Sequence, residues 1–167
     1  MDDEDIDRRP TMLGVLVAVF AAFAIGVLFS QYSMIVTAPV ALGLIGLLVG
    51  GSIGNRQLAS AGIALVVLAI LMAGLYNYPV STILATGVLA VVSWDAVDNG
   101  FTMGRQLGRV ADTRRAEVLH LGATILSGTV VAGVIYGIFV MTPAGWPLTA
   151  LVLTTLAAVL LALALEL

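Results

Sequence analysis

The residues that could do chemistry together in this sequence are three carboxylates and one imidazole, Asp95, Asp98, Glu117 and His120. Such groups near the mouth of a membrane protein can form a proton relay or a cation site. A simpler interpretation is available, because Asp98 with Arg105, and Arg114 with Glu117, can form ion pairs on helix surfaces. We favour the ion-pair interpretation, since water reaches residues near the edge of an apolar span. His120 is then expected to be a hydrogen-bonded structural residue.

Other kinds of site have little support in the composition. The chain has no cysteine and one histidine, which excludes disulfides, thiolate catalysis and clusters of imidazole ligands. No phosphate-binding loop or catalytic triad is present, and Gly100–Gly108 lacks the strand that precedes a nucleotide fingerprint. We therefore expect a protein that is not an enzyme. It should have no catalytic residue, cofactor or metal site, and no nucleic-acid partner.

The elements that must position these residues are long apolar helices. Of the 167 residues, 60% are hydrophobic and 10% are charged, whereas about 25% of the residues of a soluble domain are charged. An apolar run of about 20 residues matches the thickness of a bilayer. The sequence predicts an all-α, polytopic membrane protein of six transmembrane helices in three hairpins: Met12–Phe29, Ile35–Ile53, Leu58–Leu75, Val80–Trp94, Val118–Met141 and Leu148–Leu165.

The arginines predict how these helices are oriented. All seven basic residues are arginine, and with six spans every one of them falls on the same side of the membrane. Because basic residues are retained in the cytoplasm, both termini are expected to be cytoplasmic in a multi-pass protein of the cell membrane. We expect an acidic cytoplasmic tail over residues 1–11. A six-helix domain over residues 12–167 then includes a cytoplasmic polar helical segment, residues 95–117.

Three glycines at a spacing of four make this polar segment the best candidate for docking. Each exposed glycine inside a helix costs about 1 kcal/mol relative to alanine, so Gly100, Gly104 and Gly108 make sense only if something packs against them. That partner is another part of this chain, a second copy or a different protein. The expected docking residues are Gly100, Gly104, Arg105, Gly108 and Arg109. We favour a helix that continues through Asn99-Gly100, and the alternative ends it at Asn99 with Gly100 as a left-handed cap.

Small residues also recur every four positions within three of the apolar spans, the first, the second and the fifth. Such stripes let helix backbones approach closely in lipid, where packing replaces the hydrophobic driving force. The expected helix-packing residues are Gly46, Gly50 and Gly54 in the second span, and Gly133 and Gly137 in the fifth.

One region of the sequence resembles a known family. The stretch from Trp94-Asp95-Ala96 to Gly104-Arg105-Gln106-Leu107-Gly108-Arg109, then Ala111-Asp112-Thr113-Arg114-Arg115-Ala116-Glu117 and His120, resembles an uncharacterised family of small haloarchaeal membrane proteins. The Gly145-Trp146-Pro147 turn and the helix after it resemble the C-terminal end of that family. The absence of lysine and the acidic head agree with such an origin. The resemblance implies a lineage, and it supplies no activity or catalytic residue.

These observations favour a non-catalytic integral membrane subunit or scaffold that docks through residues 95–117 and through small-residue helix faces. Its expected partners are the lipid bilayer and other membrane subunits or further copies of itself. The alternative is a small channel or facilitator for an uncharged solute, lined by glycine, serine and threonine. A continuous polar path between the helices would favour the channel, whereas a packed core with an occupied glycine stripe would favour the subunit.

Overall fold

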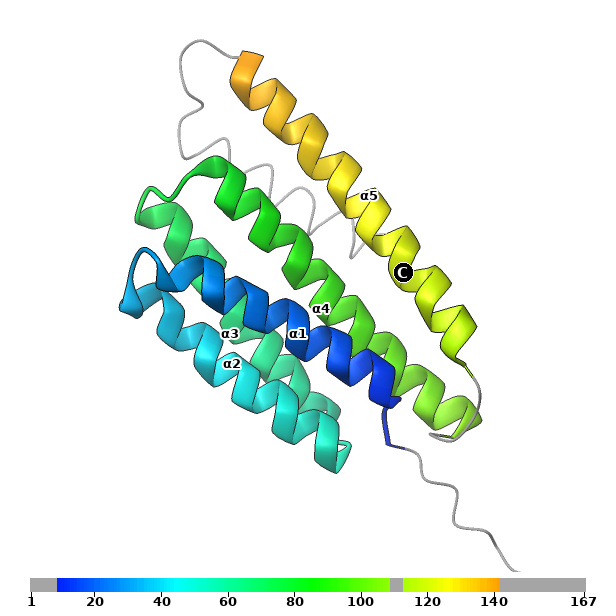
Figure 1. Ribbon diagram of the computed structural model, residues 1–167. Coiled ribbons are helices and arrows are strands. Elements are labelled where there is room, and N and C mark those ends of the chain that lie inside the picture. The colour runs from blue at the N-terminus through cyan, green and yellow to red at the C-terminus, as the bar shows by residue number, and fades with distance from the viewer. Residues whose placement is uncertain (1–8, 109–112, 142–167) are drawn as a thin grey trace, which may run out of the picture. The chain divides into compact units, whose positions relative to one another are not determined.

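The protein is all-helical throughout the residues that its computed structural model describes, 9–108 and 113–141. Five helices lie in these ranges, and no strand does: α1 (Met12–Ser30), α2 (Met34–Ile53), α3 (Arg56–Leu75), α4 (Val80–Leu107) and α5 (Arg114–Met141) (Figure 1). All five are long and apolar enough to cross a membrane. For the described residues, the prediction of an all-α fold with several helices suited to span a membrane is therefore confirmed. The expected sixth span, Leu148–Leu165, lies outside the described residues.

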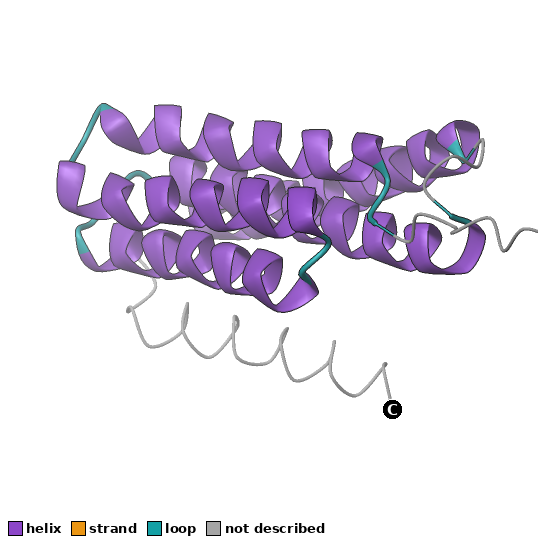
Figure 2. Cartoon of the chain, turned by 90° about the horizontal axis from the view of Figure 1, so that it is seen from below, coloured by secondary structure: helices purple, strands orange, loops and turns teal. Residues whose placement is uncertain are grey.

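Helices α1 to α4 form a bundle in which neighbours along the chain run in opposite directions. Each helix contacts two others, because α1 packs against α2 and α4, and α3 packs against the same two helices. Figure 2 shows the helices of this bundle with their axes nearly aligned. The centre of the bundle is filled by side chains with no exposed surface, among them Ile25, Phe29, Val36, Leu47 and Val66. Large apolar side chains also cover the outside of each helix, as expected where the surroundings are lipid.

Short polar connections set the helix ends. Thr11, Ser33 and Asn55 stand at the N-caps of α1, α2 and α3, where each side-chain oxygen accepts a hydrogen bond from a backbone N–H of the first turn. Gly54 follows the end of α2 with a φ of +76°, a conformation that favours glycine. Gly54 therefore makes the tight turn into α3 and does not lie on the packing face of α2 where the sequence pattern placed it.

Backbones touch where α2 crosses α3. A Cβ atom added at Gly43 would lie 2.6 Å from the carbonyl oxygen of Gly62, and one at Gly46 would lie 3.0 Å from the Cα atom of Gly62. At Gly50 the added atom would lie 2.5 Å from the backbone nitrogen of Ala59. The glycine face of α2 is thus occupied within the chain, because no side chain larger than hydrogen fits between these two backbones.

Helix α4 continues through Asn99-Gly100 and ends at Leu107. Its 28 residues extend over about 42 Å, which exceeds the roughly 30 Å hydrocarbon thickness of a bilayer. Arg105 lies in its last turn, where a cation is favourable for the helix dipole. Gly108 follows as the C-cap residue with a φ of +81°, so the glycine that ends this helix lies eight positions later than the alternative interpretation placed it.

The chain divides into two compact units, residues 1–132 and 133–167. The first unit contains α1 to α4 and the part of α5 up to Ala132. The described residues of the second unit are 133–141, which form the last turns of α5.

Candidate functional site

The described charged residues of the first unit gather toward the end of the bundle where α1 and α3 begin and α4 ends. The start of α1 lies beside α4, because the backbone N–H of Thr11 donates to the carbonyl of Gly100 over 3.1 Å. Arg56, at the start of α3, contacts Asp98 of α4. We call this end of the bundle the arginine end, since Arg9, Arg56, Arg105, Arg114 and Arg115 lie on the helix ends and turns there. Arg8 and Arg109 lie outside the described residues.

The glycine stripe of α4 is covered by the segment that leads into α1. We call residues 9–11 the strap. A Cβ atom added at Gly104 would lie 2.1 Å from the carbonyl oxygen of Arg9, and one at Gly100 would lie 3.1 Å from Oγ1 of Thr11. Gly14, one turn into α1, is equally close, because its added Cβ would lie 2.5 Å from the carbonyl oxygen of Ala96. Of the three partners considered for the stripe, the structure therefore places another part of this chain on Gly100 and Gly104.

A buried carboxylate ties the strap to α5. Glu117 is 3% exposed, and its Oε2 accepts a hydrogen bond of 2.8 Å from the hydroxyl of Thr11. Its Oε1 accepts a second hydrogen bond from the hydroxyl of Thr113, directly before α5. A buried carboxylate needs such donors, because an unpaired charge away from water is costly. Glu117 thus joins α1 to α5, and its described hydrogen bonds are to hydroxyls rather than to Arg114.

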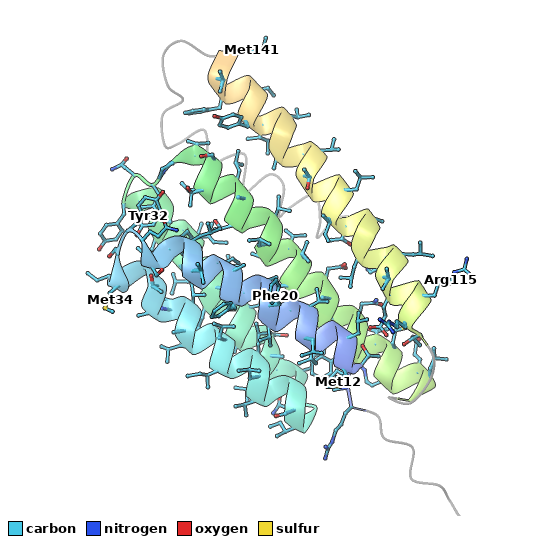
Figure 3. The ribbon with its side chains drawn as sticks, in the orientation of Figure 1. Met12, Phe20, Tyr32, Met34, Arg115 and Met141 are labelled. Carbon is cyan, nitrogen blue, oxygen red and sulfur yellow. The ribbon has the colours of Figure 1, made fainter. Side chains whose placement is uncertain are left out.

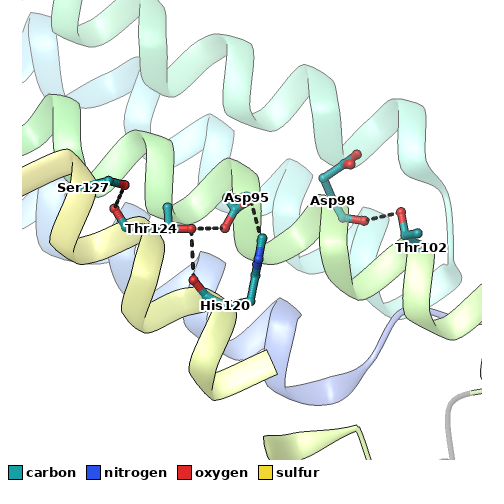
Figure 4. Close-up of polar contacts among 6 residues, drawn as sticks. All are labelled: Asp95, Asp98, Thr102, His120, Thr124 and Ser127. Carbon is teal, nitrogen blue, oxygen red and sulfur yellow. Dashed lines mark hydrogen bonds and ion pairs between the residues drawn. The ribbon is translucent and has the colours of Figure 1, made fainter. Parts of the chain in front are cut away.

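A second polar contact, one turn further along α5, joins this helix to α4 (Figure 4). Asp95 is hydrogen-bonded through Oδ1 to Nε2 of His120 over 3.0 Å. Its other oxygen accepts a hydrogen bond of 2.7 Å from the hydroxyl of Thr124. The side chain of His120 is about half exposed at 48%, and that of Asp95 is 29% exposed. His120 therefore has a hydrogen-bonded position on α5, and its charge state sets whether the contact is also an ion pair.

Asp98 points to a different neighbour. Its carboxylate pairs with the guanidinium of Arg56, while its backbone carbonyl accepts a hydrogen bond of 3.0 Å from the Thr102 hydroxyl. Figure 4 shows Asp98 turned away from His120. Asp98 does not pair with Arg105, because seven residues along a helix separate the two by about 10 Å.

The four ionisable residues singled out from the sequence thus belong to three separate contacts. Asp95 and His120 lie together, Asp98 pairs with Arg56, and Glu117 lies with two threonines. Within the described residues no group of three or more His, Asp and Glu side chains is arranged to hold a metal ion. A continuous relay through all four would need contacts that this geometry does not make, so the arrangement favours helix-to-helix joints.

Some of the docking residues expected from the sequence are buried, and others are exposed. Gly100, Gly104 and Gly108 are buried, whereas Arg105 is exposed together with Gln106 and Leu107. Near them, α5 begins with exposed Arg114 and Arg115, and Figure 3 shows Arg115 pointing away from the helices. Val118 and Leu119 on the next turn are also exposed, Leu119 at 67%. The exposed surface at the end of α4 and the start of α5 therefore consists of arginine and apolar side chains, and the glycines are not part of it.

Gly133 and Gly137 lie in the second unit, and no atom of the described residues comes within 4 Å of a Cβ added at either position. The packing partner that the sequence pattern predicts for them is thus not supplied by any described residue.

Several residues of the site were not predicted from the sequence. Thr11 and Thr124 supply hydroxyls to the acids, and Ser93 of α4 donates to the carbonyl of Ala18 in α1 over 2.8 Å. The pairing of Arg56 with Asp98 joins residues 42 positions apart. One signal was available for the position of Glu117, because an acid in the first turn of a helix is favourable for the helix dipole.

The match to a family model extends over almost the whole chain, residues 8–162. The chain belongs to the family of unknown function DUF7519. Every helix described above lies within the matched range, so the strap, the glycine stripe and the α4–α5 joints all lie in the part of the chain that defines a DUF7519 member. No curated protein and no solved structure matches the chain. The prediction of an uncharacterised family is confirmed at that level, and the comparisons add no activity to it.

Proposed function

We propose that this DUF7519 protein is a non-catalytic integral membrane subunit or scaffold, which docks other membrane proteins at its arginine end. The observation that carries the proposal is the combination of a packed core with an occupied glycine stripe. The centre of α1 to α4 is filled by apolar side chains such as Ile25, Phe29 and Val66, and the strap covers Gly100 and Gly104. A channel for an uncharged solute needs a continuous polar path instead, so this packing favours the subunit.

The docking surface of this proposal consists of exposed side chains at the end of α4 and the start of α5. We define it as Arg105, Leu107, Arg115, Val118 and Leu119, all of which are exposed. Arginine and large apolar side chains are the residues that contribute most to protein interfaces when they become buried together. The partner that fits is a membrane protein, or a second copy of this chain, that presents acidic and apolar side chains at the same depth.

The proposal includes the orientation and origin of the chain. Six spans, with both termini in the cytoplasm, would place all seven arginines on the side where basic residues are retained. The docking surface would then face the cytoplasm. A haloarchaeal source is supported by the use of arginine without lysine and by the acidic residues at the start of the chain. The same high salt would weaken exposed charge pairs, because the Debye length falls to about 3 Å at 1 M salt. Apolar contacts such as that of Leu119 are therefore expected to contribute most.

A pair of matched double variants tests the docking surface. Arg115→Gln with Leu119→Ala removes one charge and one exposed leucine from it. Gln57→Glu with Leu58→Ala makes the same net charge change and the same truncation at the start of α3, also at the arginine end. Native purification in mild detergent, followed by quantitative mass spectrometry of the intact complex, measures association for each.

We expect the first double variant to weaken association by more than tenfold, the loss that follows when two interface residues each contribute about 1 kcal/mol. The second double variant should associate like the wild type. Equal association of both variants with the wild type would contradict the proposal. Equal loss in both would show a general effect on folding and would contradict it as well.

A further inference from the structure

An open groove runs along the outer face of α3 beside α4, within the first unit. Its volume is about 540 Å³, which is within the range of roughly 300–1,000 Å³ that small-molecule sites have. Ile63, Val67 and Leu71 of α3 line it together with Trp94 of α4, whose side chain stands half exposed at one edge. The groove is therefore almost entirely apolar along its length.

Polar groups lie at one end of this groove. Ser60 lines it one helical turn from Arg56, because residues four apart lie above one another on a helix. On α4, Trp94, Asp98 and Arg105 lie on one face, since separations of four and eleven residues return to nearly the same side of the helix. The Arg56–Asp98 ion pair thus stands beyond Ser60 and Trp94, at the arginine end.

The charge at this end of the groove is positive. Arg56 and Arg105 carry two positive charges and Asp98 carries one negative charge. Arg56 contacts Asp98 through Nη2, and a guanidinium has five N–H donors, so it can bind a second anion while it keeps this contact. The side chain of Arg56 is 46% exposed, which leaves it accessible from the membrane surface.

We infer that this groove binds an anionic phospholipid, with one acyl chain along α3 against Trp94 and the phosphate on Arg56. From Arg56 to Leu71 the helix rises about 22 Å, so the groove follows a lipid chain from the membrane surface past the midplane of a bilayer about 30 Å thick. A guanidinium binds phosphate oxygens in a bidentate manner. Ser60 adds a hydroxyl between the phosphate and the apolar part of the groove. This site shares Arg105 with the proposed docking surface, but its groove and its phosphate contact at Arg56 lie outside that surface and do not depend on it.

The inference distinguishes a specific lipid from the general contact that any membrane protein makes with its bilayer. General contact requires neither a cation at the end of the groove nor a preference for lipid charge. The proposed site requires both, because the phosphate of a zwitterionic headgroup is neutralised by the cation of that headgroup, whereas the phosphate of an anionic lipid has no such cation and pairs more strongly with Arg56.

The test measures lipid binding to the full chain in mild detergent by titration in native mass spectrometry. The two probes are dioleoyl phosphatidylglycerol, which is anionic, and dioleoyl phosphatidylcholine, which has the same chains and no net charge. We expect the wild type to retain the anionic lipid more tightly. Arg56→Gln should weaken phosphatidylglycerol binding by about tenfold, the loss that corresponds to one charge-assisted contact, and should barely change phosphatidylcholine binding.

Asp98→Asn separates a lipid contact from a structural ion pair. If Arg56 binds the phosphate, removal of the competing carboxylate leaves phosphatidylglycerol binding unchanged or tighter. If Arg56 acts only through its pair with Asp98, both variants weaken binding alike, and the inference is overturned.

Ala64→Phe tests the apolar part, because Ala64 lines the groove and a phenyl ring there fills it. Ala61→Phe is its control, since Ala61 is exposed on the same helix and does not line the groove. We expect only Ala64→Phe to weaken the binding of both lipids.

Equal effects of the two phenylalanine substitutions, or equal binding of the two lipids to the wild type, would overturn the inference. If another helix fills the groove, Ala64→Phe would lower the unfolding temperature without changing lipid binding, which would overturn it too. If Arg56→Gln fails to fold, the Asp98→Asn variant and the comparison of Ala64→Phe with Ala61→Phe still test the inference.

Discussion

Replacement of Gly104 by alanine should destabilise the protein, although alanine is the better helix former. The added Cβ would lie 2.1 Å from the carbonyl oxygen of Arg9, 2.9 Å from the carbonyl carbon of Arg9 and 3.1 Å from the Cα atom of Pro10. These are backbone atoms, which no side-chain rotation can move away. Ordinary contact begins at 3.4 Å, so the strap has to retreat by about 1.3 Å, the difference between 3.4 and 2.1 Å.

The size of the effect follows from the hydrogen bonds that this retreat disrupts. The backbone bond from Thr11 to Gly100 contributes about 1 kcal/mol, and the bond from the Thr11 hydroxyl to the buried carboxylate of Glu117 contributes about 1.5–3 kcal/mol. Alanine returns up to about 1 kcal/mol through its helix propensity. The free energy of unfolding should therefore fall by about 1.5–3 kcal/mol, which corresponds to a decrease of roughly 3–12 °C in Tm for a chain of this size.

Thermal unfolding in mild detergent measures this change, and Gly87→Ala is the matched control. Gly87 lies in the same helix, and no described atom comes within 4 Å of its added Cβ, so the control should be neutral or slightly stabilising. Thr11→Val supplies the second arm of a double-mutant cycle. If the strap is already displaced in Gly104→Ala, the valine should cost much less in that background than in the wild type. Additivity within about 0.5 kcal/mol, or a Gly104→Ala variant as stable as the wild type, would refute the strap as the cover of the glycine stripe.

Three further predictions follow from other contacts. Gly62→Ala should destabilise by about 1–3 kcal/mol in thermal unfolding, because its Cβ would lie 2.6 Å from the carbonyl oxygen of Gly43, whereas Gly74→Ala, with open space around it, should not. Asp95→Ala should lower stability by about 1 kcal/mol, since two donors on α5 lose their acceptor, and an unchanged Tm would contradict that joint. A cysteine introduced at Asn77 should react with a membrane-impermeant maleimide from outside the cell, and one at Arg56 only after permeabilisation; the reverse pattern would contradict the proposed orientation.

The helices could be predicted from the sequence because apolar length alone specifies them in a membrane. The bounds expected for α1 to α3 differ from those observed by one or two residues. Helix α4 exceeds its apolar run by 13 residues, from Trp94 to Leu107, since its polar extension is stabilised by tertiary contact with the strap. The glycine spacing correctly indicated that this extension must be covered. The spacing did not indicate which part of the chain covers the glycines, because Gly104 contacts a segment 95 positions away along the chain.

The polar contacts were harder to predict for a related reason. Ion pairs were expected within one segment, between residues on neighbouring turns. The structure instead joins Arg56 to Asp98 and Thr11 to Glu117, across 42 and 106 positions. A search for oppositely charged residues does not find threonine, because its side chain is uncharged. A hydroxyl is nevertheless a suitable donor for a buried carboxylate, since it satisfies the oxygen without adding a second buried charge. Such pairings depend on which helix ends meet, and that is a property of the bundle rather than of any single stretch.

The bond between Thr11 and Glu117 has a consequence for the order in which the protein is made. The first helix leaves the ribosome long before its partner, because 106 residues separate the two side chains. At a synthesis rate of about 5–20 residues per second, the delay is roughly 5–20 s. Throughout that interval the hydroxyl of Thr11 lacks its carboxylate acceptor. A nascent chain that stalls before α5 would thus have an arginine end without Glu117. The hydrogen bond between Thr11 and Glu117 therefore forms only in a chain whose synthesis has passed the start of α5.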